Sequence, residues 1–173
     1  NATQAAATNS VSITPAPLGV TINAVYSGTA TVTPTSFTVT GLVNSQTINS
    51  ISAATINAIN VAANSSNYVT AITIGSGTAS IGNYSISTAY NAAPSNTQNT
   101  VTLTPKSLTV TGITIAAKTY NGNNAATVSG GSLVGVSAGD VANVTLSQSA
   151  TFTSVNVANN VALVMVSGIS GSA

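Results

Sequence analysis

An internal repeat with a period of about 90 residues restricts the fold more than any other feature of this sequence. The segment 11–21 returns as segment 101–111, and Asn1-Ala2 returns as Asn91-Ala92. Six positions of the longer segments are identical, namely Val11, Thr14, Pro15, Leu18, Val20 and Thr21, which recur as Val101, Thr104, Pro105, Leu108, Val110 and Thr111. A repeat this long predicts whole domains in tandem.

Further matches continue along the chain at slightly larger offsets, so small insertions separate the two copies. Tyr26-Ser-Gly28 matches Tyr120-Asn-Gly122, and Asn60-Val-Ala62 matches Asn156-Val-Ala158. A parallel β-helix would instead repeat every 20 to 30 residues or so. We therefore predict an all-β chain of two tandem sandwich-like domains of about 90 residues each, with a parallel β-helix as the alternative.

Alternation of apolar and polar residues predicts β-strands along most of the chain. Thr next to Val or Ile suits a pleated surface that is half-buried. The clearest segments are 37–40, 69–74, 101–103, 108–115, 144–146 and 161–166. Between residues 45 and 61 the isoleucines fit neither the helical nor the strand period, and we expect a short helical turn there.

Proline and glycine mark the expected boundaries inside each repeat. The candidate inter-domain connectors lie ahead of predicted strands and are Thr14, Pro15, Pro17, Thr104 and Pro105. The candidate turn motifs of the repeat are Tyr26, Gly28, Tyr120, Asn121 and Gly122. Asn121-Gly122 predicts a tight hairpin turn, and Gly130-Gly131 predicts a further turn.

The repeats are out of phase with the two ends of the sequence. Residues 1–12 read as a connector from a preceding unit, 13–102 as the first repeat and 103–173 as the second. The strand-like segment 83–90 has no counterpart in the second repeat, so we predict that the second domain lacks its final strand. Two explanations stay open: a stretch of a longer array, or a subunit whose sheet is completed by the next copy.

Charge is nearly absent, since Lys106, Lys118 and Asp140 are the charged side chains among 173 residues. Charged residues make up about 25% of an ordinary soluble domain. One carboxylate gives no acid/base pair, and without His or Cys neither a Ser nucleophile nor a transition-metal site can be assembled. Two lysines cannot follow a nucleic-acid backbone. We expect no enzyme activity, no cofactor, no metal and no nucleic-acid partner.

The remaining composition indicates a folded chain with a neutral surface. Hydrophobic residues make up 43%, which is enough for a core. A net charge of +1 provides little repulsion between copies, so self-association is expected. No apolar run reaches the length of about 18 residues that a membrane span needs, so no membrane insertion is expected. The lack of Cys fits a reduced cytosol or a bacterial exterior, and the near absence of Lys and Glu argues against the cytosol, so we expect an extracellular, secreted or cell-surface location.

Three groups of polar side chains allow more specific hypotheses. Lys118 and Asp140 could join an Asn in an isopeptide crosslink, but the first repeat has no such pair, so we expect a solvated Lys118 and a turn-capping Asp140. The tyrosines could form a glycan-binding platform, although the matching positions of Tyr26 and Tyr120 favour packing. Thr-x-Thr strings such as 109–111 suit an ice-binding face or simply a wet strand face.

The second repeat carries a succession of short motifs: Lys118-Thr-Tyr-Asn-Gly122, then Leu133-Val-Gly-Val136 and Gly139-Asp140, then Ala150-Thr-Phe152 and Asn156-Val157. This succession resembles the YDG repeat of large bacterial surface adhesins, with Asn121 where that family has Asp. The first repeat resembles the related MBG-type repeat in segments 13–18, 26–28, 37–43 and 83–86. The resemblance implies tandem β-repeats of secreted, filamentous-haemagglutinin-like proteins, and it implies no catalytic site.

Together these observations predict a non-enzymatic structural repeat module of an extracellular fibre or a cell-surface adhesin stalk. Its assembly would proceed by stacking of β-domains or by strand donation, with copies of itself or neighbouring repeats as partners. The alternative is a module that binds glycans, a surface or ice, in which case surface glycans are its partners.

Overall fold

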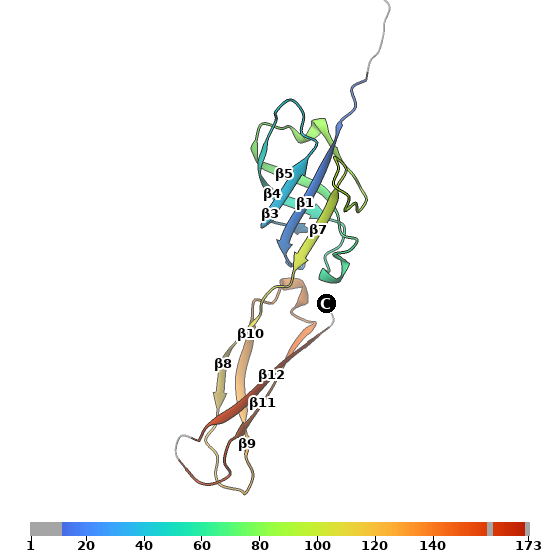
Figure 1. Ribbon diagram of the computed structural model, residues 1–173. Coiled ribbons are helices and arrows are strands. Elements are labelled where there is room, and N and C mark those ends of the chain that lie inside the picture. The colour runs from blue at the N-terminus through green and yellow to red at the C-terminus, as the bar shows by residue number, and fades with distance from the viewer. Residues whose placement is uncertain (1–11, 159–160, 172–173) are drawn as a thin grey trace, which may run out of the picture. The chain divides into compact units, whose positions relative to one another are not determined.

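The computed structural model describes residues 12–158 and 161–171 (Figure 1). Residues 1–11 of the predicted connector 1–12 therefore lie outside the described part. The described chain consists of β-strands and three short 3-10 turns, η1 Val61–Ala63, η2 Ile81–Asn83 and η3 Ala138–Asp140. The all-β prediction is confirmed. The parallel β-helix alternative is wrong, because most neighbouring strands pair antiparallel.

The chain divides into two compact units. Among the described residues, unit 1 holds 12–24, Ala30–Ala58 and Ala62–Leu103. Unit 2 holds the remainder from Thr104 onward together with two short segments, Val25–Thr29 and Ile59–Val61. In the described part of each unit there are two sheets, and none of these sheets closes into a barrel.

The first sheet of unit 1 is built around a long central strand, β1 Ala16–Val25. One edge of β1 pairs antiparallel with β3 Ser36–Thr40, in the register Gly19↔Thr40. The opposite edge holds two strands in succession, β6 Tyr84–Ile86 and then β7 Asn99–Thr104. Val20 N donates to Gln98 O at 2.7 Å at this second edge. The hydrogen-bonding groups of β1 are therefore used on both sides.

The second sheet of unit 1 has the order β2-β4-β5, with β2 Thr31–Val32, β4 Ile48–Ile56 and β5 Val69–Gly77. The helical turn expected within 45–61 is for the most part wrong, since β4 fills most of that range. Several bulges interrupt the register between β4 and β5. Each bulge adds a residue to the strand, which moves buried positions from a spacing of two to three and hides the strand period.

The core of unit 1 draws buried side chains from both of its sheets. These are Leu18, Val20, Ile22, Ala24, Val32, Ile48, Ile51, Ala54, Ile56, Val69, Ile72, Tyr84, Val101 and Leu103. The alternate burial along β1 and β7 follows from the period of two in a strand. Unit 1 thus has the dense apolar interior of a sandwich.

Unit 2 has fewer strands. Its first sheet is a single antiparallel pair, β8 Thr109–Ile115 with β10 Val128–Val134. Its second sheet has the order β12-β11-β9, with β9 Ala125–Ala126, β11 Val144–Phe152 and β12 Leu163–Gly171. Ala150 is the only buried hydrophobic side chain of the described part of unit 2.

The two units use the same pairing scheme, and the sequence repeat aligns their registers. Three pairs of unit 1 are Gly19↔Thr40, Thr31↔Thr55 and Ile48↔Gly77, and their counterparts in unit 2 are Thr109↔Val134, Ala125↔Thr151 and Val144↔Gly171. Strands β8 to β12 therefore correspond in order to β1 to β5. Within the described residues, β6 and β7 have no counterpart in unit 2.

Three local predictions from proline and glycine need correction. Asn121-Gly122 does not form a two-residue hairpin, because the pair Ile115↔Val128 leaves residues 116–127 as the connection. Gly130-Gly131 lies inside β10, where positive φ angles kink the strand instead of reversing the chain. Pro17 lies inside β1, near its start, where a missing N–H is tolerated.

Candidate functional site

Among the residues that the structure describes, an unpaired strand edge distinguishes unit 2 from unit 1. Strand β8 pairs with β10 on one side, and no described strand pairs with its other side (Figure 1). The corresponding edge of β1 is covered by β6 and β7. Exposed N–H and C=O groups on such an edge are a template for another β-strand.

The apolar surface beside this edge is also open. Leu163, Met165 and Ile169 on β12 are exposed, although their pairing partners on β11 place them on the inner face of the sheet. Leu163 is 40% exposed, whereas Val69, its counterpart in unit 1, is 0% exposed. Val164 and Val166 are exposed on the opposite face of the same strand. Strand β12 therefore presents apolar side chains on both faces.

Strand β7 explains why the equivalent surface of unit 1 is closed. Its Val101 and Leu103 are buried in the core. Its Asn99 is fully buried too, where Asn99 Nδ2 donates to Val69 O and Val69 N donates to Asn99 Oδ1, both at 2.8 Å. One strand thus supplies apolar filling and a side-chain clamp on β5. Strand β12 of unit 2 corresponds to β5. No described residue of unit 2 covers β12 with apolar side chains or clamps it with a side-chain amide.

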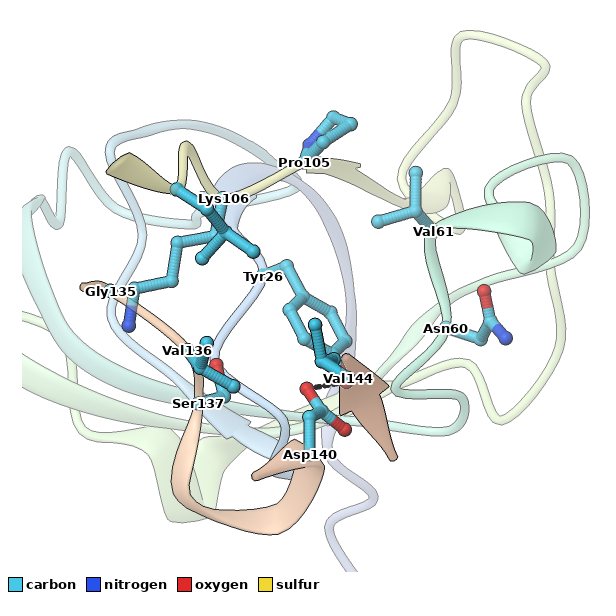
Figure 2. A pocket seen from close by; sticks show the side chains of 11 residues that line it. Tyr26, Asn60, Val61, Pro105, Lys106, Gly135, Val136, Ser137, Asp140 and Val144 are labelled. Carbon is cyan, nitrogen blue, oxygen red and sulfur yellow. Dashed lines mark hydrogen bonds between the residues drawn. The ribbon is translucent and has the colours of Figure 1, made fainter. Parts of the chain in front are cut away.

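A pocket of about 280 Å³ forms the second candidate site of unit 2 (Figure 2). Tyr26 lies on the segment 25–29, and its hydroxyl donates to Asp140 Oδ2 at 2.8 Å. This hydrogen bond, with smaller contributions from burial and the negative charge of Asp140, raises the pKa of Tyr26 above its ordinary value. The pocket is otherwise lined mainly by apolar side chains, among them Val61, Leu108, Val136 and Val144.

Ser137 adds a polar atom to this pocket. Its side chain is 6% exposed, and its Oγ has no hydrogen-bond partner. A buried hydroxyl without a partner costs free energy of about 1–3 kcal/mol. Gly28 makes room beside it, because a Cβ on Gly28 would lie 3.0 Å from Ser137 Cβ. Gly28 also has a φ of +75°, a value that favours glycine.

The tyrosines do not behave as the repeat alignment predicts. Tyr26 is half-buried and hydrogen-bonded, whereas Tyr120 is 62% exposed, so the expectation of a shared packing role is wrong for Tyr120. The buried tyrosine is Tyr84, whose hydroxyl accepts from Val43 N at 3.1 Å and donates to Gln46 Oε1. Sequence reasoning missed this role, because residues about 40 positions apart meet only in the folded sheet.

Lys118 and Asp140 do not form a crosslinking cluster. Lys118 Nζ donates to the main-chain oxygens of Asn123 and Ala125, at 2.8 and 3.0 Å, and to the side chain of Asn123. Asp140 instead accepts the bond from Tyr26. The expectation that Lys118 is simply solvated is therefore wrong, since Lys118 holds the 116–124 loop together.

The remaining predicted residues lie outside or at the ends of strands. Thr14 and Pro15 precede β1, Thr104 is the last residue of β7, and Pro105 follows it. Asn121 and Gly122 lie in the long loop before β9. The connector role of the Thr-Pro pairs stays a prediction, as do the domain limits 13–102 and 103–173.

The described residues offer no cluster of three His, Cys, Asp or Glu side chains that could hold a metal ion. Across the same residues, no helix has the length and apolar character needed to cross a membrane. The titratable side chains other than tyrosine are Lys106, Lys118 and Asp140.

Comparison with known families adds one finding. Residues 104–173 match the model of the YDG domain, which covers unit 2 from its first strand to its last. No curated protein and no solved structure gives a significant match to the chain. The match supports the YDG resemblance of the second repeat, and the MBG-type resemblance of the first stays a prediction.

Proposed function

We propose that this chain is a non-enzymatic structural repeat module of an extracellular fibre or a cell-surface adhesin stalk. The observation that carries the proposal is the recurrence of one pairing register in two successive units, which is how repeat proteins build length from a single design. The YDG match of residues 104–173 supports the same conclusion. The partners would be copies of the chain or neighbouring repeats.

The proposed mechanism is association of neutral β-units through their open edges and faces. Short connectors at Thr14-Pro15 and Thr104-Pro105 would limit bending, because proline stiffens a linker. Three charged side chains leave little to titrate or to screen. Fibre mass should therefore stay constant between about pH 4 and pH 9 and up to about 1 M salt. Loss of fibres on mild acidification, measured by sedimentation, would contradict this mechanism.

Electron microscopy of the native material, combined with the intact mass of the released chain, tests the proposal. Fibres that release chains of about 16.8 kDa indicate polymerised subunits. Fibres that release one much larger chain indicate tandem repeats within a single stalk. Dispersed monomers at high protein concentration would reject the structural role in either form.

Binding of a glycan or a surface is the second candidate function. The observation that favours it is the pocket in which Ser137 Oγ lacks a partner beside the Tyr26–Asp140 hydrogen bond. One sugar hydroxyl group could form the hydrogen bond that Ser137 Oγ lacks, and another could donate to the Asp140 carboxylate alongside Tyr26. A glycan array tests this role, with Asp140→Asn as the disabling variant and Tyr120→Phe as the control outside the pocket. Equal binding by wild type and Asp140→Asn would reject the pocket.

A further inference from the structure

We propose that Asn121 is a site of spontaneous covalent modification. The main-chain nitrogen of Gly122 attacks the Asn121 side chain and converts it to an aspartyl or an isoaspartyl residue. No other asparagine of the sequence is followed by glycine. The modification needs only the chain itself and water, so it does not depend on the proposed fibre.

The attacking nitrogen is free and accessible. Asn121 and Gly122 are exposed, and the Gly122 N–H makes no hydrogen bond with any described residue. Gly122 has a φ of +78°, and a Cβ placed on it would meet no atom within 4 Å. Because glycine has no side chain, nothing shields this nitrogen from the Asn121 side chain beside it.

The loop also holds the Asn121 side chain close to this nitrogen. Asn123 N donates to Asn121 Oδ1 at 3.3 Å, which is the hydrogen bond of an asparagine turn around Gly122. This bond draws electron density from the side-chain carbonyl carbon, and no described residue bonds the leaving nitrogen Nδ2. Lys118 steadies the turn, since its Nζ donates to Asn123 O at 2.8 Å. Such positioning favours an intramolecular attack.

The reaction balances without any oxidant or reductant. A bond forms between Gly122 N and Asn121 Cγ while the bond from Cγ to Nδ2 breaks. The leaving nitrogen takes the proton of the Gly122 N–H and departs as ammonia, which leaves a five-membered succinimide. One water then opens the ring at either carbonyl. Opening at one carbonyl gives an aspartyl residue, and opening at the other gives an isoaspartyl residue.

The same turn occurs at the matching place of the first repeat, where Ser27-Gly28 aligns with Asn121-Gly122. Thr29 N donates to Ser27 Oγ at 3.4 Å, and Gly28 has a φ of +75°. Ser27 is exposed as Asn121 is, although the chain continues well beyond Ser27. Exposure is therefore a property of the turn in both repeats. A serine has no amide, so the first repeat has the turn without the reaction.

Asparagines elsewhere are held more firmly. Three of their side chains each form two main-chain hydrogen bonds, namely Asn64, Asn67 and Asn99. Asn91 is the matched control, since Ala93 N donates to Asn91 Oδ1 at 3.0 Å. However, Asn91 Nδ2 donates to Thr97 O at 3.3 Å, and Ala92 carries a Cβ next to the attacking nitrogen.

The product changes the charge of a nearly neutral chain. Each event adds one carboxylate and lowers the formal net charge from +1 to zero. An aspartyl carboxylate accepts the Asn123 N–H more strongly than an amide does, because hydrogen bonds to charged groups are stronger. An isoaspartyl residue instead adds one carbon to the main chain and displaces the turn. Copies of different age would therefore differ in charge and in the shape of this loop.

Peptide mapping of the ageing chain tests the proposal. The purified chain is kept in neutral buffer at constant temperature, and tandem mass spectrometry follows the exchange of amide nitrogen for oxygen at each asparagine. An isoaspartyl methyltransferase reports the isoaspartyl product. We expect Asn121 to convert at least about tenfold faster than Asn91, with both products formed. Equal rates at the two asparagines, or an aspartyl product alone, would overturn the proposal.

Matched variants test the turn itself. Asn121→Ser copies Ser27 and should abolish the acidic form in isoelectric focusing. Gly122→Ala should slow the conversion at least about tenfold, because a Cβ shields the nitrogen and disfavours a positive φ. Ser27→Asn places an amide before Gly28 and should create a second site. A Ser27→Asn chain that gains no second site would overturn the role assigned to the turn, and urea unfolding checks that each variant is folded.

Discussion

Unit 1 and unit 2 share a pairing register, but they differ in the number of described strands around their central strand. In unit 1, β1 is paired on both edges, and the buried side chains of both sheets meet in one core. In the described part of unit 2, β8 is paired on one edge, and the equivalent apolar positions other than Ala150 are half-buried or exposed. The arrangement of strands is therefore encoded separately from the density of the core.

The difference can be traced mainly to β7. Asn99, Val101 and Leu103 come from this one strand, and all three are buried. A strand that fills a sandwich from its edge contributes to both sheets at once, since its side chains lie between them. The described part of unit 2 forms the same hairpins with few buried apolar side chains, which indicates a lower local stability.

Replacing two matched leucines by alanine should give the largest difference in stability between the two units. Leu18 of unit 1 and its counterpart Leu108 of unit 2 differ in burial, because Leu18 is fully buried and Leu108 is half-buried. We expect Leu18→Ala to lower the free energy of unfolding by about 2–5 kcal/mol and Leu108→Ala by about 1 kcal/mol or less. Urea unfolding measures both values. Equal losses would show that unit 2 has a core comparable to that of unit 1.

Removing the side-chain clamp should make unit 1 resemble unit 2. Asn99→Ala leaves the main-chain groups of Val69 without their partners, which should cost about 2–3 kcal/mol. Amide exchange gives a direct reading, since the Val69 N–H should exchange slowly in wild type and the Leu163 N–H quickly. In Asn99→Ala the two rates should converge. Asn121→Ala, in the exposed loop of unit 2, is the control that should change neither rate. A Leu163 amide as protected as that of Val69 in wild type would contradict the comparison.

The sequence predicts that the chain is all-β and built from two related units, because the repeat with small insertions aligns the strands of unit 1 with those of unit 2. That the second domain lacks its final strand stays a prediction. The course of β4 escapes prediction because its bulges remove the period of two on which strand recognition depends. Asn121-Gly122 misleads for a related reason, because two residues do not report the length of a loop that Lys118 holds together through bonds to Asn123 and Ala125.

The candidate pocket shows a different limit. Tyr26 and Asp140 are 114 positions apart, and no spacing rule connects residues at that separation. The matching positions of Tyr26 and Tyr120 suggest equal roles, but only Tyr26 has an acidic group within reach. Repeats conserve the main-chain path more faithfully than the environment of each side chain, since the environment depends on neighbours that differ between the units.

Substituting the two tyrosines should give the smallest difference and should depend on pH. Tyr26→Phe removes a half-buried hydrogen bond to a carboxylate, worth about 1 kcal/mol after allowance for solvent, whereas Tyr120→Phe should change nothing measurable. Because the pKa of Tyr26 is raised in the folded state, its stabilisation is complete below about pH 10 and is lost as the pH rises through the folded-state pKa. Unfolding of wild type and Tyr26→Phe from pH 8 to pH 12 should therefore give curves that converge at high pH. A difference that stays constant over this range, or a Tyr120→Phe variant that behaves like Tyr26→Phe, would show that the hydroxyl of Tyr26 does not bond Asp140 in solution.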